Sequence, residues 1–242
     1  MSYLFSIVLK IIDFFYQKKI INFFKNTSNS EYTVIIDVGA HKGETILSFL
    51  KNLKVQNIYS FEASNKTYKS LEINVEKIKK KYDRTNIEIF NTGIGNSNEK
   101  KIFNELPDSN SSTFNLIDQN SSYFIRKNKI LSFFFKKKFS INKNLISQIK
   151  LSQFIEKKKI KKISILKIDT EGYELDVIKG LGQNIQLVEF IYFEHHYDNM
   201  IKKNYKFSEI HDFLLTNGFQ RVFKIKMPLR KSFDYIYSKK TV

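Results

Sequence analysis

The sequence has no cysteine and only four histidines among its 242 residues. The lack of cysteine excludes disulfides, thiolate zinc sites and cysteine nucleophiles, although it leaves the redox compartment undecided. Any bound metal must therefore be held by oxygen atoms, with or without one histidine.

Long uncharged apolar runs are also lacking. Residues 3–25 are rich in Phe, Ile and Leu, but Lys10 and Asp13 interrupt them before they reach the roughly 20 residues that a transmembrane helix needs. The segment also lacks the basic, apolar and small-residue order of a cleaved signal peptide. We therefore expect residues 1–30 to form an amphipathic helical extension. It either packs on the following domain or lies at a membrane interface with its lysines among the headgroups.

The charge is strongly one-sided, because 41 basic residues face 24 acidic ones and give a formal net charge of +17. Such a charge favours anionic partners such as nucleic acid, phospholipid headgroups or phosphorylated sugars. However, most of the excess lies in lysine runs, which usually form a solvated surface. The hydrophobic content of 42% is enough for the core of one domain over residues 31–242.

An apolar run at residues 34–36 ends in Asp37, and the glycine turn that follows leads into a helical pattern. Gly39 and Gly43 let the backbone approach a ligand closely. The dinucleotide fingerprint G-x-G-x-x-G, which serves a pyrophosphate, is lacking. Instead Asp37 and Glu44 flank the glycines, and an acidic loop suits the sulfonium and ammonium of S-adenosylmethionine. His41, inside the loop, is expected to help position this cofactor.

A second acid supports an adenosine-containing cofactor. Residues 57–61 predict a second strand, and Glu62 at its end occupies the position from which a carboxylate binds both ribose hydroxyls. The turn over residues 92–95, with Thr92 and Gly93, is expected beside the adenine.

Several of these motifs are shared with one family. They are the stretch from Val34 to Glu44, Phe61-Glu62-Ala63, the block Lys167-Ile168-Asp169-Thr170-Glu171-Gly172-Tyr173-Glu174 with Val177-Ile178-Lys179-Gly180 after it, and Phe193-Glu194-His195. In this order they resemble the FkbM family of S-adenosylmethionine-dependent methyltransferases, from about Tyr32 to Ser238. The K-I-D-x-E-G-x-E block is the specific part. One departure is Ala63, where the family usually has a proline.

The resemblance implies an O-methyltransferase that modifies hydroxyls, often on sugars or glycosylated natural products. It also implies an α/β fold of the Rossmann-like class I methyltransferase type, with a mostly parallel seven-stranded sheet and helices on both faces. The regular strand–helix alternation from Tyr32 agrees with such a sheet. Within it, Asn65 and Ser208 are expected to cap helices.

Residues 104–146 interrupt the alternation. They contain a polar loop and then an aromatic and basic block that ends in Phe133-Phe134-Phe135-Lys136-Lys137-Lys138-Phe139. So many aromatic side chains must be buried against something. We expect an elaboration over the active site that acts as a lid or substrate platform. An oligomer contact, a membrane contact and a locally packed hairpin remain as alternatives.

Four predicted strands end in acids, and ligands of an open parallel sheet bind beyond the carboxyl ends of its strands. Asp37 and Glu62 are expected to face the cofactor, which leaves Asp169, Glu171, Glu194 and the His195-His196 pair for the methyl group and the acceptor. Methyl transfer to a hydroxyl needs in-line placement and commonly a base or a metal. His195 is the expected base, and Mg²⁺ held by Asp169 and Glu194 is the alternative.

The expected function is therefore O-methylation of a hydroxyl on a sugar, glycan or glycosylated metabolite. RNA or other nucleic-acid methylation is the competing function, but the Asn/Asp-Pro-Pro-aromatic motif typical of base methylation is lacking, and an acidic mouth repels a polyanion. A non-catalytic membrane-associated module is a third hypothesis. We expect a cytoplasmic protein, with residues 1–25 as a peripheral contact to the inner face of the membrane and with oligomerisation left open.

Overall fold

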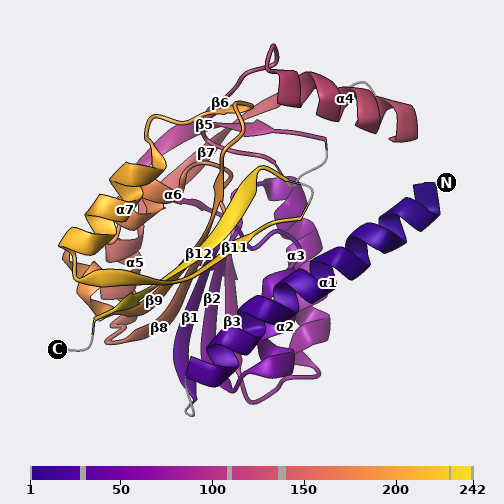
Figure 1. Ribbon diagram of the computed structural model, residues 1–242. Coiled ribbons are helices and arrows are strands. Elements are labelled where there is room, and N and C mark those ends of the chain that lie inside the picture. The colour runs from indigo at the N-terminus through magenta and orange to yellow at the C-terminus, as the bar shows by residue number, and fades with distance from the viewer. Residues whose placement is uncertain (1, 28–30, 108–110, 136–139, 229, 241–242) are drawn as a thin grey trace.

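The strand–helix alternation builds a seven-stranded central sheet in the computed structural model (Figure 1). The structure describes residues 2–27, 31–107, 111–135, 140–228 and 230–240, without the side chains of residues 2–14, 131 and 133–135. In spatial order the strands are β11 (Phe219–Lys226), β12 (Ser232–Lys239), β9 (Val188–His196), β8 (Ile163–Ile168), β1 (Tyr32–Val38), β2 (Val55–Phe61) and β3 (Asn86–Phe90). The five strands from β9 to β3 run parallel, β12 runs antiparallel to β9, and β11 runs antiparallel to β12. This confirms the predicted fold class.

Neighbouring residues on each strand face opposite sides of the sheet, as the pleat requires. On β9, Phe190 and Tyr192 belong to one hydrophobic cluster, whereas Ile191 and Phe193 belong to the other. Both clusters are rich in branched apolar side chains, because the central strands are buried on both faces.

Helices cover each of these faces. The first cluster includes side chains of α1 (Ser2–Thr27), α2 (Glu44–Asn52) and α3 (Asn65–Lys79). The second cluster includes side chains of α5 (Leu151–Lys158), α6 (Glu174–Lys179), the 3₁₀-helix η1 (Gly182–Leu187) and α7 (Phe207–Thr216). Consequently the face beneath α1 to α3 is also the face toward which Tyr192 and the alternate residues of β9 point.

Two expected helix caps differ from the structure. The hydroxyl of Ser64, rather than Asn65, accepts the Thr67 amide at 3.2 Å, because the extended backbone of Ser64 directs its side chain back to the first turn. Ser208 lies inside α7, and Glu209 instead accepts the Lys206 amide at 2.7 Å.

Residues 93–150, which include the interrupting segment, form structure of their own above the sheet in Figure 1. β4 (Gly93–Gly95), β7 (Asn142–Lys150) and β5 (Glu99–Glu105) make a three-stranded sheet, so residues 93–95 are a strand and not the expected turn. The segment also contains β6 (Leu116–Ile117), which pairs with β10 (Ile201–Lys202), and α4 (Ser122–Phe135). The expected burial of the aromatic block at residues 133–139 lies outside the described side chains.

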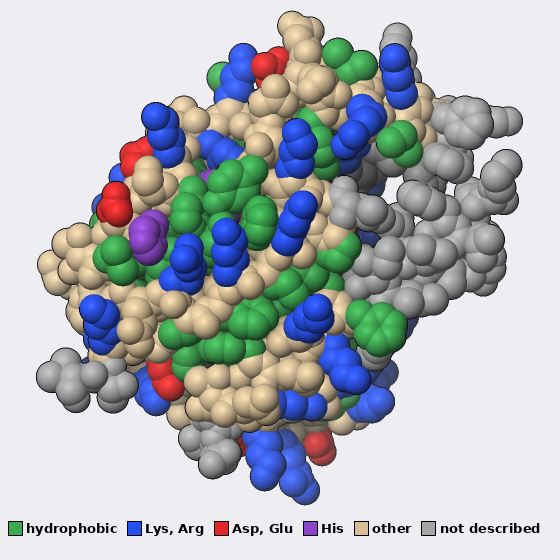
Figure 2. All heavy atoms as spheres, in the orientation of Figure 1, with side chains coloured by type: hydrophobic (Ala, Val, Ile, Leu, Met, Phe, Trp, Pro, Cys, Tyr) green, Lys and Arg blue, Asp and Glu red, His purple; other side chains and the backbone are tan. Residues whose placement is uncertain are grey.

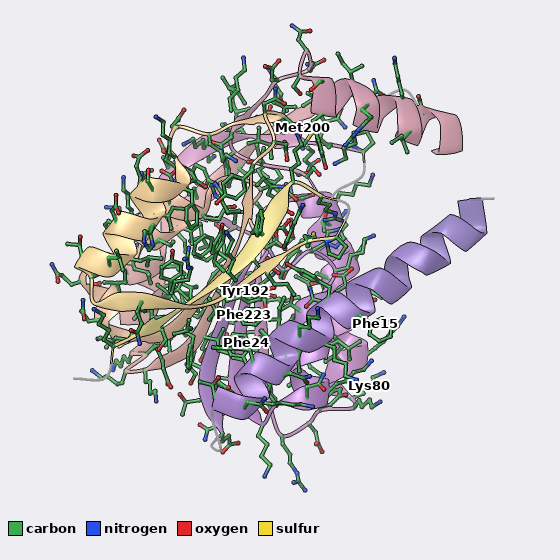
Figure 3. All side chains as sticks on the ribbon, viewed as in Figure 1. Phe15, Phe24, Lys80, Tyr192, Met200 and Phe223 are labelled. Atoms are coloured by element: carbon green, nitrogen blue, oxygen red, sulfur yellow. The ribbon has the colours of Figure 1, made fainter. Side chains whose placement is uncertain are left out.

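The second half of α1 packs on the domain. Tyr16, Ile20, Ile21 and Phe24 are all buried, which is the spacing of one helical face. Phe24 contacts Tyr192 with a ring-centroid distance of 6.2 Å, and both lie between α1 and the sheet in Figure 3. Within the described residues, no helix has the length and apolarity needed to cross a membrane.

Candidate active site

A cavity of about 390 Å³ lies at the carboxyl ends of the parallel strands. Its wall combines residues that follow β1, β2 and β8 with residues from β9, β12, α1 and the segment above the sheet. The lining includes Gly39, His41, Glu44, Glu62, Thr92, Gly93, Asp169, Glu171 and Glu194. This is the place where open parallel sheets bind ligands.

The loop after β1 is tightly folded against its neighbours. The amides of Gly39 and Ala40 both donate to the carbonyl of Phe61, at 2.9 and 3.0 Å. Gly39 has a φ of +85°, and a Cβ there would lie 1.9 Å from the carbonyl oxygen of Asp169. Only glycine fits this position, which explains why the turn needs it.

Glu62 is held firmly in the cavity wall. Its carboxylate accepts hydrogen bonds from the amides of His41 and Ser64, each at 2.9 Å. Burial raises the pKa of Glu62 to about 7, although these amides act in the opposite direction. A carboxylate fixed beside a glycine loop fits the ribose of an adenosine-containing ligand, because each oxygen keeps a lone pair for a hydroxyl.

Six of the eight predicted cofactor residues line the cavity: Gly39, His41, Glu44, Glu62, Thr92 and Gly93. Asp37 and Gly43 do not. Asp37 is on β1 and only 1% exposed, and its Oδ1 lies 3.4 Å from Nζ of Lys167. Gly43 precedes α2, where a Cβ would contact Leu71 of α3. Both residues therefore support the loop without lining the cavity.

Lys167 is a residue whose role the sequence did not reveal. It pairs with Asp37 on the neighbouring strand and also lies 3.3 Å from Oδ2 of Asp169. Burial acts to lower the pKa of Lys167, but the two carboxylates outweigh it and raise that pKa. In turn, Lys167 holds the pKa of Asp169 below its usual value despite burial. The ammonium therefore stays charged and neutralises this side of the cavity.

His196 is the histidine that contacts the predicted acceptor-side acids. Its Nε2 lies 3.2 Å from Oε2 of Glu171 and 3.2 Å from Oε1 of Glu194. Burial acts to lower the pKa of His196, but the carboxylates of Glu171 and Glu194 raise it to about 10. His196 is thus an imidazolium that compensates these two acids.

His195 is placed differently from its prediction. It points to the opposite face of β9 from Glu194 and packs among Tyr197, Tyr205 and Phe207. Burial lowers the pKa of His195 to about 3, so the ring is neutral at ordinary pH. The expectation treated His195 as the start of a loop, whereas β9 continues through His196 and keeps its two-residue alternation. His195 is not among the residues that line the cavity.

The structure gives the magnesium expectation no support. Among the described residues, no group of three or more His, Cys, Asp or Glu side chains has the arrangement of a metal site. Asp169 and Glu194 both line the cavity, but Lys167 and His196 are their close partners.

Further lining residues lie outside the motifs. They are Tyr16 and Gln17 of α1, Phe103, Ser112 and Phe114 of the segment above the sheet, and Tyr192, Met227, Arg230 and Asp234 near β9, β11 and β12. Only Asp234 carries a signal in the sequence, as a lone acid within the apolar strand pattern of residues 233–237.

Comparisons with known proteins agree with this geometry. The sequence model of the family described as "Methyltransferase FkbM domain" matches residues 37–221 of the chain. No curated protein sequence matches the chain. Because the match to the family covers well over half of the chain, it establishes membership.

Solved structures show the same fold at low sequence identity. An FkbM methyltransferase from Methylobacillus flagellatus KT is 13% identical with a TM-score of 0.55, and the match covers 86% of this chain and 45% of that one. Magnesium protoporphyrin IX methyltransferase from Synechocystis PCC 6803, with bound S-adenosylmethionine, is 8% identical with a TM-score of 0.54, covering 95% and 81%. TrmK from M. capricolum, with S-adenosylhomocysteine, is 11% identical with a TM-score of 0.51, covering 94% and 69%.

The chain therefore spans less than half the length of the Methylobacillus protein. The loop after β1 and Glu62 after β2 lie within residues 37–221, as do most of the residues that line the cavity. The chain belongs to the FkbM family of methyltransferases and has the Rossmann-like fold of S-adenosylmethionine-dependent methyltransferases.

Proposed function

We propose that the protein transfers a methyl group from S-adenosylmethionine to a hydroxyl of a sugar, glycan or glycosylated metabolite. The observation that carries this proposal is the division of the cavity into two chemically different ends. In the strand order, the glycine loop and Glu62 follow β1 and β2 at one end, whereas Asp169, Glu194 and Asp234 come from β8, β9 and β12 at the other.

At the first end, the loop of Gly39 and His41 would receive the donor, with Glu62 on the ribose and Thr92 and Gly93 beside the adenine. Glu44 lines the cavity, where it would offset a positive charge on the donor, and its carboxylate contacts Nδ1 of His41 at 3.2 Å. The donor supplies the electrophilic methyl group, and these residues bind and orient it.

At the second end, Asp169, Glu171, Glu194 and Asp234 line the cavity. Carboxylates accept strong, charge-assisted hydrogen bonds from hydroxyl groups, so several of them suit a polyhydroxylated acceptor. Lys167 and Arg230 also line this part of the cavity, but the four carboxyl groups outnumber them, so the phosphates of a nucleic acid would on balance meet like charge. This contrast favours a sugar hydroxyl over RNA.

The net charge of +17 does not oppose this proposal, because Lys167 and Arg230 are the only Lys and Arg residues among those described that line the cavity. Figure 2 shows Lys and Arg side chains scattered across the face in view, between apolar and uncharged areas. Such a surface would attract an acceptor that is linked to an anionic carrier, such as a phosphorylated sugar.

A labelling experiment tests the acceptor class. The protein is incubated with methyl-labelled S-adenosylmethionine and, separately, with free glycans, nucleotide- or lipid-linked sugars, and tRNA. We expect base-stable label in a sugar pool, and mass spectrometry would show a methyl ether. Label in tRNA alone would overturn the proposal.

We also propose a cytoplasmic enzyme that contacts the inner face of the membrane through the first part of residues 1–25. Its support is the sequence, in which apolar residues from Tyr3 to Ile12 precede the buried Tyr16. Flotation with vesicles that contain anionic phospholipid would test it, and binding that survives removal of residues 1–12 would contradict it.

A further inference from the structure

Asp234 and Glu194 lie opposite one another on adjacent strands. Asp234 of β12 is the register partner of Glu194 of β9, so their side chains share one face of the sheet, and both line the cavity. Like charges opposite each other destabilise a sheet. An arrangement that keeps two such carboxyl groups together therefore needs a reason.

Asp234 has one oxygen that is ready to accept a hydrogen bond. The side chain is 2% exposed, and Tyr192 donates to its Oδ2 at 3.0 Å. Within the described part of the chain, Oδ1 has no hydrogen-bond partner. A buried carboxylate oxygen without a partner is costly, and a ligand hydroxyl in the cavity would satisfy it.

The other acids at this end are closely paired with cations. Glu171 and Glu194 lie within 3.2 Å of the His196 ring, and Asp169 lies 3.3 Å from Nζ of Lys167. A cation beside a carboxylate competes with a ligand hydroxyl for its oxygens, although burial and the nearby Glu194 raise the pKa of Glu171 to about 8 against the effect of His196. The groups that contact Asp234 are instead the neutral hydroxyls of Tyr192 and Tyr16, so no cation competes with a ligand for its carboxylate among the described residues.

We propose that Asp234 is the catalytic base, with Oδ1 accepting the proton of the acceptor hydroxyl. This inference rests on the proposed transfer of a methyl group to a hydroxyl. The acceptor oxygen forms a bond to the methyl carbon, and the carbon–sulfur bond breaks with its electron pair left on sulfur. The acceptor O–H bond breaks and its proton passes to Asp234. S-adenosylhomocysteine and a methyl ether are the products.

The surroundings of Asp234 agree with this role. Burial and then the nearby Glu194 raise its pKa well above the usual value for aspartate, although its hydroxyl contacts act in the opposite direction. A raised pKa brings a carboxylate closer to the range in which a base works at neutral pH. The titratable groups that face it are Tyr16 from α1, Tyr192 and Glu194 from β9, and Asp169 after β8.

The first test compares Asp234→Asn with the wild-type protein and with Asp212→Asn, a control on an exposed acid of α7. The assay uses whichever pool the wild-type protein methylates. We expect turnover to fall about 100-fold or more in Asp234→Asn, with loss of the acidic limb of its pH–rate profile and with unchanged affinity for S-adenosylhomocysteine. Asp212→Asn should behave like the wild type.

The second test needs no acceptor. Difference infrared spectra across the pH range should show a protonated buried carboxyl that disappears in Asp234→Asn and shifts in Tyr192→Phe. The assignment would be overturned if this infrared signal persists in Asp234→Asn, or if Asp234→Asn keeps the acidic limb of the pH–rate profile. It would also be overturned if Glu171→Gln, and not Asp234→Asn, loses that limb. If the wild-type protein labels tRNA and no sugar, the proposed acceptor class fails, while the same variants still decide on Asp234.

Discussion

Replacement of Glu62 by Ala should weaken the binding of S-adenosylhomocysteine without unfolding the domain. Glu62 is 8% exposed and its two oxygens already accept one amide each, so the carboxylate is oriented before the ligand arrives. A charge-assisted hydrogen bond to the ribose contributes roughly 1.5–3 kcal/mol. We therefore expect the Kd to rise about 10- to 150-fold, since each 1.4 kcal/mol corresponds to a factor of about ten.

The same contact should depend on pH. The pKa of Glu62 is about 7, above that of a free glutamate, so the carboxyl is protonated below this value and ionised above it. Only the ionised form accepts hydrogen bonds with both oxygens. Affinity should therefore rise with pH through about 7 in the wild-type protein, and this rise should be absent in Glu62→Ala.

Isothermal titration calorimetry at several pH values measures both effects. Glu72→Gln, an exposed acid on α3, is the matched control and should bind like the wild type. Unchanged affinity in Glu62→Ala, or tighter binding of NAD than of S-adenosylhomocysteine by the wild type, would refute the assignment of this residue to the ribose.

Three further substitutions test the framework around the cavity. Lys167→Met leaves the buried Asp37 without its cation and should lower the free energy of unfolding by about 3–5 kcal/mol, measured in urea. Phe24→Ala removes a fully buried ring and should cost about 3–5 kcal/mol, whereas Phe15→Ala, on a side chain that is 59% exposed, should cost much less. His195→Phe removes an imidazole whose Nδ1 has no hydrogen-bond partner among the described residues, and should raise stability by about 1 kcal/mol without changing donor affinity.

The opposite outcomes would be informative. Equal stability of Lys167→Met and the control Lys162→Met, on an exposed lysine, would show that Asp37 is not ionised. Equal losses in the two phenylalanine variants would contradict the packing of α1. Loss of a pH–rate limb in His195→Phe would contradict the placement of His195 outside the cavity.

The parts of the fold that local sequence specifies were predictable. The apolar run before Asp37, the glycines after it and the K-I-D-x-E-G-x-E block each fix a short stretch of backbone. These stretches end parallel strands, so their acids had to meet at one edge of the sheet. Six predicted cofactor residues line the cavity for this reason.

The features that long-range pairing specifies were not predictable. Whether His195 or His196 reaches the acids depends on where β9 ends, and its antiparallel pairing with β12 extends it beyond Glu194. Likewise, the position of Asp234 opposite Glu194 depends on a register between strands about 40 residues apart in the chain, as seen in the Tyr192–Asp234 contact at a separation of 42 residues. Neither choice leaves a local signal.

The packing of α1 has a consequence for synthesis. The hydroxyl of Tyr16 donates to the carbonyl of Ile225, a contact that spans 209 residues. During translation, α1 therefore leaves the ribosome long before the strand that completes its docking surface has been made. Its apolar side chains must wait for that strand, in contact with water, a chaperone or a lipid surface. Assembly of the catalytic cavity should accordingly be a late event, with an aggregation-prone nascent chain before it.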